Sequence, residues 1–414
     1  MTLANGATWA ICVAAIAGVI VRPWRTSEAA WAVGGAVALV ALSLLPWRQA
    51  LAGVARGTDV YLFLAGMMLL AELGRSERLF DWLAARAARF ARGSPARLFA
   101  LVYGVGVIVT VFLSNDATAV VLTPAVLAAA RTARADPLPY LFVCAFVANA
   151  ASFVLPIANP ANFVVFGSDL PPLGTWLARF ALPSLAAIVA TFVALRLAQR
   201  RALHGALAAD VPIPALTSGG RVAAGGLVAA AVALTLASTF GLDLGVATFA
   251  AAIATLAVVL GVERKMPWAI ARHVTWGILP LVAGLFVLVE GLRVTGTIAS
   301  LQAALREAAS HSVPITAVLA GIVVALACNV LNNLPAAFIA GATAAGVHAD
   351  PRITDAILVG IDLGPNLSVA GSLATILWLA ALRRDGVRVR GIDFLRVGAW
   401  VMPPALVLAL AAVV

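Results

Sequence analysis

Asparagine is the residue type whose placement most restricts the chemistry of this sequence. Nine asparagines occur, and eight of them fall inside four apolar stretches: Asn115, Asn149, Asn159, Asn162, Asn329, Asn332, Asn333 and Asn366. A buried amide is costly unless it is hydrogen-bonded. The amides therefore indicate caps that hold broken helices together, a polar binding site, or both at once.

Two of the four stretches have the pattern of a helix–break–helix hairpin. The first reads Phe112-Leu-Ser-Asn-Asp-Ala-Thr-Ala-Val-Val-Leu-Thr-Pro124, and the second reads Asn329-Val-Leu-Asn-Asn-Leu-Pro-Ala336. Ser, Asn and Asp favour turns and helix N-caps, and Pro335 suits a first helical turn. A helix that begins after each break would aim its N-terminal amides at the break, where anions or polar oxygens are favoured.

The other two stretches have the pattern of helices that are interrupted halfway. Stretch 138–167 contains Pro156 and Pro160, and stretch 353–382 contains Gly364, Pro365 and Gly371. Proline and glycine break helices. Unwound backbone at membrane depth is tolerated only where protein or a cavity surrounds it.

Two of the 18 acidic residues, Asp116 and Asp362, fall inside these polar breaks. A carboxyl group inside a membrane is expensive, so it is a functional candidate by default. The alternative is that each Asp only caps a helix. Desolvated carboxyl groups can titrate near neutral pH, which suits proton coupling. The four segments contain no Arg or Lys, which favours a neutral polar solute or a cation over a strongly anionic substrate.

No permanent metal site or cofactor is expected. Cys12, Cys144 and Cys328 stand alone in apolar runs, so they predict neither a disulfide framework nor a zinc site. The four histidines fall at predicted loops or span ends, and no His-Glu-x-x-His pattern exists.

Lipid must surround the elements that position these residues. The 414 residues are 63% hydrophobic and 11% charged, whereas a soluble domain is about a quarter charged. Mean hydropathy is +1.03. The net charge of +10 is explained by arginine in cytoplasmic loops, so no nucleic-acid partner is expected.

The hydropathy pattern predicts an all-α integral membrane protein with ten spans and two re-entrant hairpins. The spans are 5–21, 28–46, 58–74, 138–167, 174–199, 222–240, 245–261, 275–292, 353–382 and 392–413, and the hairpins are 97–131 and 313–348. Stretches 76–92 and 297–309 are more polar and are predicted to lie in the membrane interface.

Basic residues give the predicted layout a direction. With each hairpin entering and leaving on one side, 22 of the 28 Lys and Arg residues fall on one side and six on the other. The positive-inside rule makes the rich side cytoplasmic and places both termini outside.

The sequence also contains an internal repeat. Glu72 and Asn115 recur as Glu290 and Asn333, each 218 residues later, and Asn159 aligns with Ser372 at a spacing of 213. Five spans in each half force the second copy to be inverted. We expect a first inverted repeat at 1–201, a cytoplasmic linker at 202–221 and a second repeat at 222–414, with broken helices at the bilayer midplane.

At its polar segments the chain resembles the arsenite/antimonite efflux permeases, the ArsB family of the ion transporter superfamily. The resemblance rests on the first hairpin motif, on Asn329-Val-Leu-Asn-Asn-Leu-Pro335 and on Gly360-Ile-Asp-Leu-Gly-Pro-Asn-Leu-Ser-Val-Ala-Gly-Ser-Leu-Ala-Thr-Ile-Leu-Trp378. The third motif is the most specific, and the first is shared more widely in the superfamily. The resemblance covers nearly the whole chain in span order and length.

The resemblance implies extrusion of arsenite and antimonite as neutral trihydroxides across the inner membrane, by exchange for protons or through a partner ATPase. Amides, hydroxyls and helix-end amides can bind three hydroxyl groups without net charge. We expect Ser114, Asn115, Thr118, Asn159, Asn162, Asn332, Asn333, Asn366 and Ser372 to bind substrate. We expect Asp116, Asp362 and Asn149 to serve proton coupling.

Two alternatives remain open on the sequence. A sodium/proton antiporter or carboxylate symporter of the same superfamily shares the hairpins; only the third motif and the missing basic residues weigh against it. An intramembrane enzyme would need a metal or nucleophile constellation, which the sequence does not provide.

Overall fold

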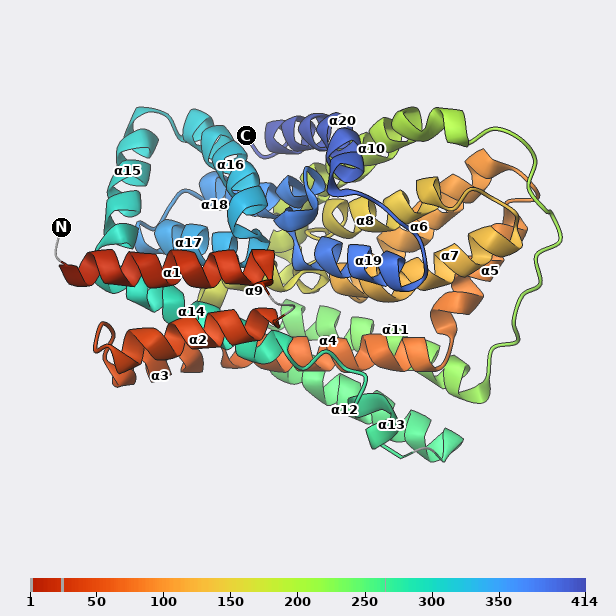
Figure 1. The fold of residues 1–414 in the computed structure, drawn as a ribbon, viewed down its shortest axis with the longest axis horizontal. Coiled ribbons are helices and arrows are strands. Elements are labelled where there is room, and N and C mark those ends of the chain that lie inside the picture. The colour runs from red at the N-terminus through yellow and green to blue at the C-terminus, as the bar shows by residue number, and fades with distance from the viewer. Residues whose placement is uncertain (1–2, 24–25, 265) are drawn as a thin grey trace.

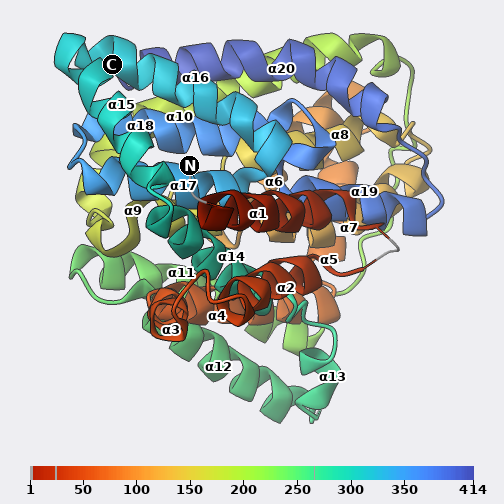
Figure 2. The same ribbon diagram turned by 60° about the vertical axis from the view of Figure 1, so that its left-hand side comes forward.

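The chain folds into two layers of long helices. The computed structural model describes residues 3–23, 26–264 and 266–414, and every regular element in these ranges is helical. One layer contains α2, α3, α4, α11, α12, α13 and α14, and the other contains the helices of both hairpins and both broken stretches (Figures 1 and 2). The all-helical membrane fold expected from the sequence is confirmed.

The described residues of the first half form ten α-helices and a π-helical turn. They are α1 (Leu3–Val21), α2 (Glu28–Ala41), α3 (Trp47–Ala55), α4 (Thr58–Ser76), α5 (Leu79–Phe90), α6 (Pro95–Phe112), the π-helical turn η2 (Ala117–Leu122), α7 (Thr123–Thr132), α8 (Leu138–Ala150), α9 (Pro160–Phe166) and α10 (Leu173–Gln199). Short 3-10 turns, η3 (Pro156–Ala158), η4 (Gly167–Asp169) and η5 (Arg200–Ala202), join or extend them.

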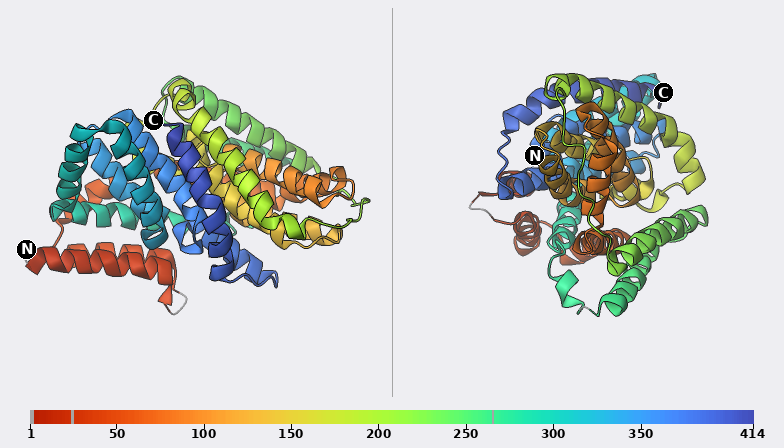
Figure 3. Two further views of the ribbon diagram at one scale, coloured as in Figure 1. Left: turned by 90° about the horizontal axis from the view of Figure 1, so that it is seen from above. Right: turned by 90° about the vertical axis from the view of Figure 1, so that its right-hand side faces the viewer.

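The second half repeats this order. It contains α11 (Ser218–Thr239), α12 (Leu244–Glu263), α13 (Trp268–Ala271), α14 (Ile278–Val294), α15 (Thr297–His311), α16 (Val313–Leu331), α17 (Asn333–Gly346), α18 (Pro351–Leu363), α19 (Leu373–Arg384) and α20 (Gly391–Ala411). The 3-10 turns η6 (Gly364–Asn366) and η7 (Val369–Gly371) separate α18 from α19. The outer helices α10 and α20 pack side by side (Figure 3).

The span count differs from the ten predicted because several spans are not single long helices. Among the described residues, seven helices are long and apolar enough to cross a membrane, and two bent pairs raise the number to nine. The predicted span 28–46 is helical only from Glu28 to Ala41, and the stretches 138–167 and 353–382 are broken as their Pro and Gly residues predict.

Two short helices, α3 and α13, were not predicted. Each precedes a long helix of its own half and packs against a helix of the other half, α3 on α14 and α13 on α4. The α3–α4 pair bends by 48° and the α14–α15 pair by 74°. The polar stretch 76–92 forms α5, which packs its apolar face on α6 and α7.

Equivalent glycines let the two halves pack closely. A Cβ on Gly66 of α4 would clash with the backbone of α12 at Thr248, and a Cβ on Gly284 of α14 would clash with the backbone of α2 at Ala32. Only glycine allows so close an approach. The 218-residue repeat therefore corresponds to reciprocal packing of α4 on α12 and of α14 on α2.

Most arginine-bearing loops gather at one end of the helices. The segments α5, α13 and the linker between α10 and α11 lie toward the right in Figure 1, while the N-terminus, α3 and α15 lie at the left. We call the former the arginine-rich end. Arg25 and Lys265, which belong to the 22 residues assigned to that side, lie outside the described residues.

Candidate functional site

The tip of the first hairpin is held by its own polar side chains. The hydroxyl of Ser114 accepts a hydrogen bond from the Ala117 N–H at 3.1 Å, and Asn115 Oδ1 accepts one from the Asp116 N–H at 2.8 Å. The helix that follows begins as the π-helical turn η2. Thr118 is fully buried, and its hydroxyl lies 2.8 Å from that of Thr110 on α6. These contacts give the break a fixed shape.

The tip of the second hairpin is tied to the second broken stretch. Asn332 has a positive φ of 72° and caps the first turn of α17. Its Nδ2 donates to the Ala370 carbonyl at 3.1 Å, and Asn329 Nδ2 donates to the Gly364 carbonyl at 3.0 Å. With ψ at 155°, this backbone is strained for any residue that has a side chain, and the hydrogen bonds of the Asn332 amide hold it in place.

The first broken stretch, between α8 and α9, is organised by two asparagines. Asn159 Oδ1 accepts from the Ala161 N–H at 3.0 Å and so caps α9. Asn162 Nδ2 donates to the carbonyls of Ser152 at 2.9 Å and Pro156 at 3.1 Å. These bonds satisfy carbonyls that the break removes from the helical pattern.

The two broken stretches meet side chain to side chain. Asn159 Nδ2 donates to Asp362 Oδ1, and Asn149 Nδ2 donates to Asn366 Oδ1 at 2.9 Å. Asn366 in turn donates to the Phe146 carbonyl at 3.1 Å. The structure thus brings Asn149, Asn159, Asp362 and Asn366 into one polar crossing between α8, α9 and α18.

Several buried oxygens around these breaks lack a donor. Among the described residues they are Asn162 Oδ1, Asn333 Oδ1, Asp362 Oδ2 and Thr375 Oγ1. Asn162 and Thr375 stand 213 residues apart, which is the repeat spacing. Ser372, the counterpart of Asn159, caps α19 by accepting from the Ala374 N–H at 3.2 Å. The breaks are therefore rich in acceptors that a hydroxyl-bearing solute or a cation could satisfy.

A cavity of about 920 Å³ connects the first hairpin tip with the arginine-rich end. Its lining runs from exposed Arg78 and Arg384 inward to buried Ser114 and Phe63. Asp116 and Pro160 also line it. Of the sequence-predicted site residues, Ser114 and Asp116 face this cavity directly. Asn115 lies between these two in the chain, and Asn159 directly precedes the lining residue Pro160, whereas Asn333, Ser372 and Asp362 are not among the lining residues.

Two of the three arginines that line the mouth of the cavity are paired with carboxylates, and the third, Arg384, is followed in the lining by Asp385. Arg75 donates to Glu72 through Nε at 2.7 Å and through a terminal nitrogen at 2.5 Å. Arg78 Nε lies 3.1 Å from Asp81 Oδ2. Paired charges leave little net field to attract an ion of either sign.

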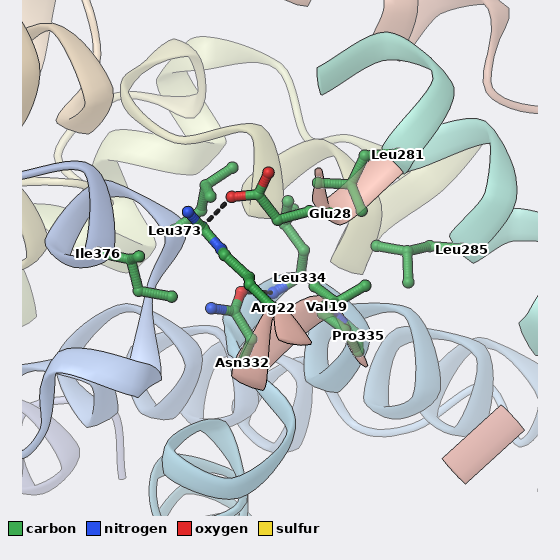
Figure 4. A pocket seen from close by; sticks show the side chains of 10 residues that line it. All are labelled: Val19, Arg22, Glu28, Leu281, Leu285, Asn332, Leu334, Pro335, Leu373 and Ile376. Atoms are coloured by element: carbon green, nitrogen blue, oxygen red, sulfur yellow. Dashed lines mark hydrogen bonds and ion pairs between the residues drawn. The ribbon is translucent and has the colours of Figure 1, made fainter. Parts of the chain in front are cut away.

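Sequence reasoning missed one cation near the site. Figure 4 shows Arg22, from the end of α1, and its ion-pair partner Glu28, from the start of α2, facing the second hairpin tip at Asn332. The space between them is about 10 Å³, roughly the room that one water needs. Long-range packing brings Arg22 to this position, so no local sequence motif predicts it there. The carboxylate of Glu28 balances the charge of Arg22.

Re-entrant hairpins and broken helices that meet at buried amides define a secondary transporter of the ion transporter superfamily. The chain belongs to the citrate transporter family, whose model matches residues 14–363. It is 30% identical to an arsenical pump membrane protein of Escherichia coli over 83% of this chain and 82% of that protein. The expected ArsB-like family is thereby confirmed, and the enzyme alternative is excluded.

Two further similarities agree with this assignment. An uncharacterised transporter of Mycobacterium tuberculosis is 26% identical over 97% of this chain and 96% of its own. The crystal structure of the YdaH transporter of Alcanivorax borkumensis matches with a TM-score of 0.60 and 16% identity, covering 89% of this chain and 87% of that one. The second match concerns the fold alone.

Proposed function

We propose that this chain exports arsenite and antimonite as neutral trihydroxides, in exchange for protons. The observation that carries the proposal is the similarity to the arsenical pump membrane protein of Escherichia coli, which extends over most of both chains. The buried hydrogen-bond acceptors at the helix breaks support the proposal independently.

A trihydroxide offers three O–H donors and carries no charge. The oxygens of Asn162, Asn333 and Thr375 are buried acceptors without donors, and an unsatisfied buried acceptor gains most from a ligand that donates to it. The cap at Ser372 places the N-terminus of α19 nearby, and its backbone N–H groups can donate to arsenic-bound oxygens. Such a site binds by hydrogen bonds alone.

Two features favour an uncharged substrate. Arg75 and Arg78 at the mouth of the cavity are paired with Glu72 and Asp81, and Arg22 beside the second hairpin is paired with Glu28. A multiply charged anion would need unpaired cations inside the membrane.

Asp116 is the group best placed for proton coupling. It lines the large cavity, so it can exchange a proton with water from the arginine-rich end. Asp362 lies off the cavity, 1% exposed, with one oxygen bonded to Asn159. We assign the main coupling role to Asp116 and a secondary role to Asp362, with Asn149 as the repeat counterpart of Asp362.

The remaining features of the proposal concern the setting of the protein. We propose an inner-membrane location with both termini outside and the arginine-rich end in the cytoplasm, on the 22:6 split of basic residues. We also propose two inverted repeats, 1–201 and 222–414, joined by the linker 202–221. The alternative to proton exchange is an arsenite-stimulated ATPase subunit, which would bind at the exposed basic end.

A second candidate is carboxylate transport, because the matching family model is described as a citrate transporter. A cheap experiment separates the two. An arsenite-sensitive bacterial host that expresses the chain should grow at arsenite concentrations that stop the same host with an empty vector. No gain in arsenite or antimonite resistance from a protein that reaches the membrane would reject the export proposal. Citrate uptake by the same cells would favour the second candidate.

A further inference from the structure

Two aromatic pairs connect the two layers beyond the inner end of the large cavity. Phe63 of α4 lies with its ring centroid 4.3 Å from that of Phe163 on α9. Phe286 of α14 lies 4.4 Å from Phe338 on α17, with the rings nearly perpendicular at 72°. In each pair one ring belongs to the α4/α14 layer and the other follows a polar break.

Both pairs lie past the breaks, away from the arginine-rich end. Phe163 is one turn beyond Pro160, which lines the cavity, and Phe63 itself closes the inner end of the lining. Phe338 is in the second turn of α17, beyond the tip at Asn332. The far end of α17 contacts α15, where Gln302 donates to the Ala342 carbonyl at 3.2 Å, and α15 lies at the opposite end of the molecule from α5 and the linker (Figure 1).

The helices that carry two of these rings leave no gap between them. A Cβ on Gly341 of α17 would clash with the backbone of α9 at Val164 and Val165. Phe63, Phe163 and Phe338 are at most 5% exposed. The region beyond the breaks is therefore packed with rings and backbone, in contrast to the 920 Å³ of open space on the other side.

We propose that the pairs Phe63–Phe163 and Phe286–Phe338 form the barrier that closes the site toward the end opposite the cavity. The structure is then the state that is open at the arginine-rich end. Release of solute at the other end requires both pairs to separate. This inference deepens the proposed function by assigning the closed side, but it does not depend on which solute is carried.

The barrier can be tested by the accessibility of a single thiol in the cavity. Val121 lines the cavity and is partly exposed, so Val121→Cys serves as the reporter in protein whose Cys12, Cys144 and Cys328 are replaced by Ala. A membrane-impermeant maleimide is applied to oriented membranes from either side. We expect fast labelling from the arginine-rich side and slow labelling from the other.

Truncation of the barrier should remove this asymmetry. Phe63→Ala with Phe163→Ala, or Phe286→Ala with Phe338→Ala, should raise labelling from the slow side by about tenfold. The matched control is Phe99→Ala with Phe192→Ala, an aromatic pair with centroids 5.9 Å apart that lies away from the cavity lining. The control should label as the parent does. Equal labelling rates in the barrier and control variants would overturn the proposal.

A second measurement uses a constraint that can be reversed in the same protein. Phe63→Cys with Phe163→Cys, in the same background without Val121→Cys, is joined by a short reducible bifunctional thiol reagent. Crosslinking should reduce transport by about tenfold or more, and a reductant should restore it. Full transport by crosslinked protein would overturn the barrier assignment. The labelling result needs no substrate, so it stands even where arsenite transport fails.

Discussion

Asn159 and Asp362, 203 residues apart in sequence, are joined by a buried hydrogen bond between the two broken stretches. Asn159 uses its amide nitrogen for this bond and its amide oxygen to cap α9. One side chain therefore links the start of a half-helix in the first half to a carboxylate at the end of α18. The side chain that caps α9 is thus also the hydrogen-bond partner of Asp362.

This contact predicts different stabilities for two Asp362 variants. Asp362→Asn keeps an oxygen that can accept from Asn159, whereas Asp362→Ala leaves a buried N–H without a partner, at a cost of about 1–3 kcal/mol. In detergent, purified Asp362→Ala protein should have a lower thermal unfolding temperature than purified Asp362→Asn protein. Equal unfolding temperatures for the two variants would mean that the bond contributes nothing to stability.

Replacement of Asp116 separates proton coupling from solute binding. Asp116→Asn mimics the protonated carboxyl, so it should abolish arsenite uptake driven by a pH gradient into inverted vesicles. It should still allow arsenite exchange at zero gradient. Both activities are measured on reconstituted protein of confirmed abundance. Normal gradient-driven uptake in Asp116→Asn would remove this residue from the mechanism and make Asp362 the main candidate.

Amides and hydroxyls at the breaks should matter more than the buried thiols. Replacement by Ala of Asn115, Asn159, Asn333 or Ser372 removes a cap or an acceptor, and a lost hydrogen bond of about 1 kcal/mol lowers affinity several-fold. Cys144→Ala and Cys328→Ala are the controls, because both thiols are buried and neither caps a helix at a break. Arsenite resistance should fall in the first set only. A loss of equal size in the controls would point to general destabilisation.

Topology follows from the distribution of basic residues and is tested by sidedness. Single cysteines in segments 75–97, 200–221 and 383–391 should react from the cytoplasm, and those in 168–173 and 241–244, like both termini, from outside. The background lacks the three native cysteines. Reaction of the 75–97 and 241–244 segments from the same side would contradict the predicted topology.

Much of the fold was predictable because its determinants are local. Ser114 and Asn115 mark the first hairpin tip, and Pro156 and Pro160 mark a broken helix, whatever surrounds them. The spacing of 218 residues between Gly66 and Gly284 reflects a packing contact that both halves share. The short helices α3, of nine residues, and α13, of four, escaped prediction because each is held by a helix of the other half.

The site was less predictable because its geometry depends on distant contacts. Asn149 pairs with Asn366 and Asn159 pairs with Asp362, and no local pattern specifies these partners. Arg22 reads as an ordinary loop arginine in the sequence, yet the fold places it beside the second hairpin tip. Likewise, the lining of the large cavity depends on how α4 and the segment 269–278 stand against the first hairpin.

The central claim is that this chain transports neutral arsenite in exchange for protons. One measurement tests this claim most directly. Purified protein is reconstituted into liposomes, and arsenite accumulation is followed while a pH gradient is imposed, with citrate and sodium as alternative substrates. We predict gradient-dependent arsenite accumulation that collapses when a protonophore is added, and no accumulation of citrate. The account would be contradicted if arsenite accumulation were the same with and without the pH gradient while the gradient drove transport of citrate or sodium.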